Sequence, residues 1–103
     1  MELRRAPRVA MQAAISMSGD DGTSQGTLLN LSTGGCAVES ETLFQKGDYL
    51  GVRVHIPDHE PPVEVDLAAV RWSSGREYGL EFIRIRDEVQ KQLRALLTLL
   101  VKG

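Results

Sequence analysis

The chain has few of the residues that build covalent links, metal sites or membrane spans. Its single cysteine, Cys36, cannot form a disulfide within the chain, which favours a reducing compartment and hence the cytoplasm. No apolar run approaches a membrane span, and the basic N-terminus lacks the apolar segment of a secretory signal. The two histidines, His55 and His59, match no strong metal-ligand spacing. We therefore expect no cofactor, no metal and no membrane insertion.

Aromatic residues and net charge are also low. The 103 residues include one Trp, two Tyr and two Phe, and the formal net charge is −2. A small barrel that binds nucleic acid polymers needs a basic groove with several exposed aromatic side chains, so we expect no such partner. No acid/base pair, activated nucleophile or phosphate loop emerges, so we expect no catalytic residues and a protein that is not an enzyme.

The most frequent pattern in the sequence is an alternation of side-chain character with a period of two residues. Larger apolar residues alternate with small or polar ones over 9–17 and again over 50–56, which predicts half-buried strands. Further strands are predicted at about 25–31, 36–39, 63–72 and 78–82. Within 63–72, Val63, Val65 and Leu67 share one phase, whereas Val70 and Trp72 share the other. A bulge near residues 68–69 accounts for this change of phase.

From Asp87, a natural N-cap, the period becomes helical. The apolar residues at this spacing are Val89, Leu93, Leu96, Leu97 and Leu100. The length predicts a single domain, mainly β, with a closed or nearly closed six-stranded antiparallel β-barrel over 9–85. A C-terminal α-helix over 87–101 covers or plugs that barrel, and residues 1–8 form an N-terminal arm.

Three cations gather in the predicted arm, at Arg4, Arg5 and Arg8. A guanidinium pairs bidentately with phosphate oxygens or with the O6/N7 edge of guanine, and it stacks on purine faces. A solvated basic tail is an equally good interpretation of this segment taken alone.

The second polar segment is the turn 30–35, at the end of a predicted strand. Asn30 and Ser32 are two residues apart, so we expect their side chains to share a face, where they offer an amide and a hydroxyl. Gly34 and Gly35 allow positive φ and a close approach of the backbone to a ligand. Ordinary turns have this composition too. Trp72 is either a core residue or a platform for a base, and Cys36 is expected to be a small core residue.

The two segments together fit a known pair of motifs, Arg-x-x-x-Arg and Asp/Asn-x-Ser-x-x-Gly, in the right order and at the right separation. Over nearly its whole length the chain resembles the PilZ domain family of bacterial cyclic di-GMP (c-di-GMP) receptors. The positions that carry the match are Arg4, Arg8, Asn30, Ser32, Gly35, Val70, Trp72, Gly79 and Phe82.

The resemblance implies a split-barrel, Greek-key β-barrel that binds c-di-GMP on its outer surface and relays the signal to a partner protein. Arg4 and Arg8 would hold phosphates and guanine edges, and Asn30 would read a guanine edge. The other implied ligand contacts are Arg5, Ser32, Gly34, Gly35 and Trp72. The alternative is a PilZ-like interaction module that works without nucleotide, for example in motility or type IV pilus assembly.

Overall fold

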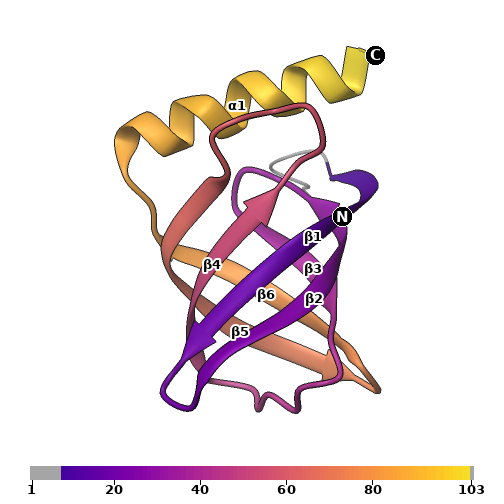
Figure 1. Ribbon diagram of the computed structural model, residues 1–103, viewed down its shortest axis with the longest axis vertical. Helices are drawn as coiled ribbons and strands as arrows, with labels where there is room; N and C mark the ends of the chain where they lie inside the picture. The colour runs from indigo at the N-terminus through magenta and orange to yellow at the C-terminus, as the bar shows by residue number, and fades with distance from the viewer. Residues whose placement is uncertain (1–7, 103) are drawn as a thin grey trace, which may run out of the picture.

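The computed structural model describes residues 8–102, which form six strands and one helix. The elements are β1 (Val9–Gly19), β2 (Gly22–Leu31), β3 (Gly35–Glu39), β4 (Tyr49–His55), β5 (Val63–Ser74), β6 (Glu77–Arg84) and α1 (Asp87–Lys102). All neighbouring strands are antiparallel, and they close a barrel (Figure 1). The predicted fold, a six-stranded antiparallel barrel followed by a helix, is confirmed.

The strand order around the barrel is β1-β2-β3-β6-β5-β4, which departs from the order in the sequence. As a result β3 pairs with β6, and β4 pairs with β1. These Greek-key neighbours place the turn that ends β2 close to the C-terminal hairpin of β5 and β6. Residues some forty positions apart in the chain therefore share one part of the barrel wall.

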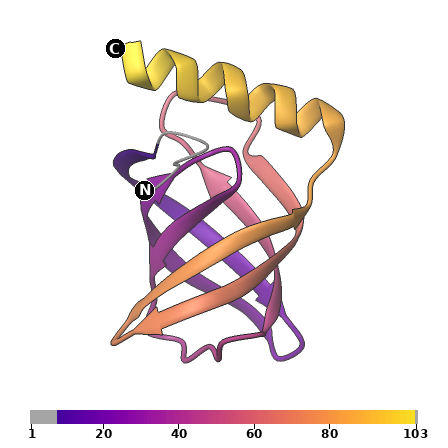
Figure 2. The same ribbon diagram turned by 180° about the vertical axis from the view of Figure 1, so that it is seen from behind.

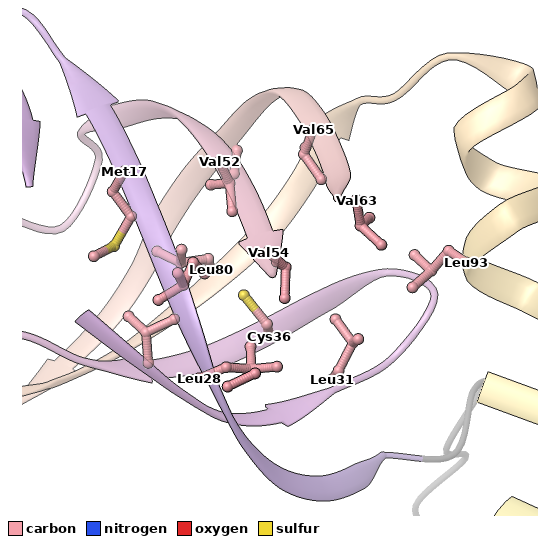
Figure 3. Packing of buried hydrophobic residues seen from close by; sticks show 14 of the residues in the cluster. Met17, Leu28, Leu31, Cys36, Val52, Val54, Val63, Val65, Leu80 and Leu93 are labelled. Carbon is pink, nitrogen blue, oxygen red and sulfur yellow. The ribbon is translucent and has the colours of Figure 1, made fainter. Parts of the chain in front are cut away.

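The core follows the predicted alternation. On β1 the side chains of Ala13, Ile15 and Met17 point inward and are buried, and β4 contributes Leu50 and Val54 in the same way. Figure 3 shows Cys36 among apolar side chains of the core that include Leu28, Val54 and Leu80. The barrel interior is thus filled by side chains, so a ligand would have to bind outside it.

The helix α1 lies across one end of the barrel, as the two opposite views in Figures 1 and 2 show. Its apolar stripe faces the barrel, and Leu93 is completely buried. Figure 3 shows Leu93 pointing from the helix towards Val63 and Leu31. The helix therefore covers the barrel end and does not plug the interior. No helix among residues 8–102 has the length and apolarity needed to cross a lipid bilayer.

Two bulges of β5 interrupt its pairing with the neighbouring strands β4 and β6. Opposite β4, β5 has one extra residue between Val65 and Ala68, which agrees with the predicted bulge near residues 68–69. A second shift lies between Val70 and Trp72 and was not predicted. Because the extra residue reverses the alternation, Trp72 is 45% exposed while Val70 is buried. The expectation that Trp72 continues the inward phase of Val70 is therefore wrong.

Candidate ligand-binding site

Four residues on four neighbouring strands form one row across the barrel wall, which we call the outer row. Asn30 of β2 pairs with Ala37 of β3, Ala37 pairs with Gly79 of β6, and Gly79 pairs with Trp72 of β5. The two middle residues have the smallest side chains available, between an amide at one end and an indole at the other. The outer row is therefore a trough with the Asn30 amide at one end and the Trp72 indole, which lies over Gly79, at the other.

A depression of about 280 Å³ lies over the outer row. Its lining also includes Arg8, Gly34, Arg71 and Glu81. The Nη1 group of Arg8 donates a hydrogen bond of 2.8 Å to Oδ1 of Asn30. The structure thus joins the second arginine of the arm motif to the first residue of the turn motif. Arg4 and Arg5, the other predicted cations, lie outside the described residues.

The indole of Trp72 lies against the backbone of Gly79. A Cβ atom added to Gly79 would overlap the ring atoms Nε1, Cε2 and Cδ1 of Trp72. Glycine at this position therefore leaves room for the indole to pack against the outer surface of the barrel, a position called its seat below. The second bulge of β5 turns the Trp72 side chain outward onto this surface. Trp72 is thus the aromatic side chain that lines the depression.

The turn after β2 is held together by Ser32. Its hydroxyl donates to the carbonyl oxygen of Gly35 at 3.2 Å and accepts from the amide of Gly34 at 3.3 Å. Ser32 is only 4% exposed and does not line the depression, so it does not share the face of Asn30 as expected. The strand ends at Leu31, so the alternation used for that expectation no longer applies. Direct contact of Ser32 with a ligand remains a prediction.

The two glycines of the turn serve different purposes. Gly34 lines the depression and has open space around it, whereas a Cβ atom at Gly35 would overlap the carbonyl oxygen of Leu80. Within the described residues, positive φ occurs at other glycines and not at these two. Gly35 is therefore needed for the close approach of β3 and β6, and positive φ is not its reason.

Charge is distributed unevenly around the depression. Arg8 and Arg71 supply two cations, and the carboxylate of Glu81 pairs with the Nε group of Arg71. Beneath the outer row, burial raises the pKa of the Cys36 thiol to about 12, although the charge of Arg8 acts in the opposite direction. Cys36 is thus an un-ionised core residue, as predicted. Across residues 8–102 no group of three His, Cys, Asp or Glu side chains could hold a metal ion.

Sequence reasoning missed Arg71, Glu81 and Ala37 as lining residues. Alternation on β6 does place Glu81 on the outer face, because its neighbour Leu80 points inward. The missing information was the pairing of β3 with β6, which brings β6 beside the turn that ends β2.

Solved structures with this fold include PilZ proteins. The PilZ domain of YcgR from Escherichia coli, solved with c-di-GMP, has a TM-score of 0.83 and 18% identity, covering 98% of this chain and 93% of its own. A longer structure of YcgR from Escherichia coli in complex with c-di-GMP has a TM-score of 0.84 and 21% identity. The match covers 99% of this chain and 47% of that structure. The Bacillus subtilis inhibitor of motility MotI/DgrA has a TM-score of 0.75 and 23% identity. The match covers 95% of this chain and 53% of that structure.

This chain therefore spans about half the length of MotI/DgrA and of the longer YcgR structure. A search of curated protein sequences finds no significant match. The family model of the PilZ domain matches residues 2–99, which include both motifs and all six strands. With this match over nearly the whole sequence and a barrel of the same fold, the chain belongs to the PilZ domain family.

Proposed function

We propose that this chain is a receptor for c-di-GMP that binds the dinucleotide in the depression over the outer row. Support comes from the family match and from the YcgR PilZ domain, which was solved with c-di-GMP. The observation that carries the proposal is the hydrogen bond between Arg8 and Asn30. It joins two motifs, 22 residues apart, at the edge of a trough that suits a flat ring.

The chemistry of the depression matches that of the ligand. c-di-GMP carries two phosphate charges and two guanine bases. Arg8 would pair with a phosphate or with the O6/N7 edge of guanine, and Asn30 would bond to a guanine edge. Trp72 would stack on a base, a contact worth about 1–3 kcal/mol. Arg4 and Arg5 would add two further cations from the arm.

Signal relay would depend on the arm. Residues 1–7 lead directly into Arg8, so a ligand bound at Arg8 would also contact the arm and favour one arrangement of it. A partner protein that recognises this arrangement would bind the ligand-loaded form better, which is the differential affinity that signalling requires. We propose a cytoplasmic adaptor without catalysis, whose turn residues Ser32 and Gly35 shape the site.

Isothermal titration calorimetry with c-di-GMP tests the binding step. Replacing Arg8 or Asn30 by alanine should weaken binding about tenfold to a hundredfold. Arg94→Ala is the matched control, because Arg94 is an exposed cation of α1 away from the depression. The absence of binding heat at high micromolar ligand, or equal affinity for all variants, would sink the proposal.

Pull-down with and without c-di-GMP tests the relay step. A partner of the adaptor should be retained more strongly in the presence of ligand, and Arg8→Ala should remove this difference. A partner retained equally in both conditions would favour the alternative, a nucleotide-independent interaction module.

A further inference from the structure

A charged pair forms the rim of the depression on the side of β5 and β6. The Nε group of Arg71 donates to Oε1 of Glu81, and both side chains are about half exposed, at 53% and 52%. Both line the same depression as Trp72. Ion pairs this exposed contribute little to stability. A carboxylate is also unfavourable beside a doubly anionic ligand, so its presence there points to a specific contact.

The second bulge of β5 creates this arrangement. Ala69 pairs with Glu81 and Trp72 pairs with Gly79, so β5 has one more residue than β6 in this interval. In a regular strand Arg71 and Trp72 would point to opposite faces. Here both are exposed, so the guanidinium, the indole and the Glu81 carboxylate gather on one side of the barrel.

Glu81 has unused acceptor capacity. A carboxylate only accepts hydrogen bonds, and Arg71 occupies one of its oxygens. Among residues 8–102, Oε2 of Glu81 has no hydrogen-bond or ion-pair partner. The Watson–Crick edge of guanine presents two adjacent donors, N1–H and the N2 amino group, which match a carboxylate. Adenine presents the N1 lone pair there, which a carboxylate repels.

Resting on the proposed function, we infer that Glu81 determines specificity for guanine. Its carboxylate accepts hydrogen bonds from N1–H and the N2 amino group of the guanine that stacks on Trp72. Arg71 is a positioning residue that holds this carboxylate and offsets its repulsion of the phosphates. The depression then has two recognition walls, Arg8 with Asn30 on one side and Arg71 with Glu81 on the other.

The competing explanation makes the opposite prediction. If Glu81 served only to neutralise Arg71, Glu81→Gln would release a cation beside the ligand. Every cyclic dinucleotide would then bind more tightly, by the same factor. If Glu81 reads guanine, the same substitution weakens c-di-GMP and leaves analogues without the N2 amino group less affected.

The experiment compares c-di-GMP with cyclic di-inosine monophosphate by calorimetry on the full chain. Inosine keeps N7, O6 and N1–H of guanine and lacks only the N2 amino group. The wild-type chain should prefer c-di-GMP by about tenfold or more, since hydrogen bonds to charged groups are strong. Glu81→Gln should weaken c-di-GMP binding about tenfold and reduce this preference. Glu77→Gln is the control, an exposed carboxylate of the same strand away from the depression.

The role of Arg71 is tested through the same preference for c-di-GMP over cyclic di-inosine monophosphate. If Arg71 only stabilised the fold, its substitution would not change this preference. Arg71→Met should lower it, and Arg71→Lys should retain most of it; these variants decide the matter if Glu81→Gln does not fold. Failure of the wild-type chain to bind c-di-GMP overturns the proposed function and this inference together. Normal binding with an unchanged preference in Glu81→Gln and Arg71→Met, or tighter binding of both ligands, overturns this inference alone.

Discussion

Adding one methyl group at Gly79 is the most specific perturbation of the site. The new Cβ would overlap three ring atoms of the Trp72 indole, which must therefore leave its seat on the barrel wall. The indole is 45% exposed, so it can move into solvent without disturbing the core. Gly79→Ala should consequently impair ligand binding more than it impairs folding.

Opposing contributions of similar size determine the effect on stability. If the indole loses roughly 60 Å² of apolar cover, the cost is about 1.5 kcal/mol at ~25 cal/mol per Å². Replacing glycine also restricts the unfolded chain, which stabilises by about 0.4–1 kcal/mol where the backbone is compatible. We expect a net loss of about 1 kcal/mol or less. Removal of the base platform, by contrast, should cost about 1–3 kcal/mol of binding, or roughly fivefold to a hundredfold in affinity.

The only tryptophan of the chain is also the reporter. Gly79→Ala should shift the fluorescence emission of Trp72 to the red, since the ring gains solvent, and calorimetry should show the loss of affinity. Gly51→Ala is the matched control, because Gly51 is a strand glycine away from the depression and its added Cβ would make only ordinary contacts at 3.8 Å or more. Wild-type emission and wild-type affinity in Gly79→Ala would refute the placement of the indole.

Three further predictions concern the hydrophobic core. Leu93→Ala deletes a completely buried side chain at the covered barrel end and should lower the free energy of unfolding by about 2–5 kcal/mol in urea. Leu99→Ala, 59% exposed on the same helix, should change it by less than ~0.5 kcal/mol, and equal effects would contradict the packing of α1. The hydroxyl of Tyr78 accepts a 3.3 Å hydrogen bond from the Phe44 amide, so Tyr78→Phe should cost about 1–2 kcal/mol by the same assay, and an unchanged urea midpoint would count against this bond. Burial raises the pKa of Cys36 from 9.0 to about 12, so over this range the thiol ionises in the unfolded chain first and stability falls as pH rises. Cys36→Ala should show a flatter decline, and identical pH profiles of unfolding would exclude this linkage.

Local pattern was sufficient to predict the fold. The alternation of Ile15 and Met17 with small or polar neighbours, and the helical spacing that includes Leu93 and Leu97, each reflect a single element that buries one face. The first bulge of β5, which lies opposite β4, was also predictable, because Val65 and Val70 lie on opposite phases of one apolar run.

The site was only partly predictable because it depends on pairing between distant strands. Arg8 and Asn30 were found through motifs, and their hydrogen bond joins them. The position of Trp72 depends on a one-residue irregularity with no sequence pattern of its own. Glu81 lies opposite Gly35 only because β3 pairs with β6, which local periodicity does not reveal.

The outer row has a consequence for how ligand preference can change. The backbones of Asn30 and Trp72 are separated by three strand-to-strand spacings, each about 4.8 Å. Backbone hydrogen bonding therefore fixes the span between the strands that carry these two residues. The distance between the two ends of the outer row can therefore change only by whole strand spacings. Of the two middle residues, only Ala37 can be enlarged without displacing the Trp72 indole, and a larger residue there divides the span into compartments. Receptors built on this wall would therefore acquire new ligand sizes in discrete steps.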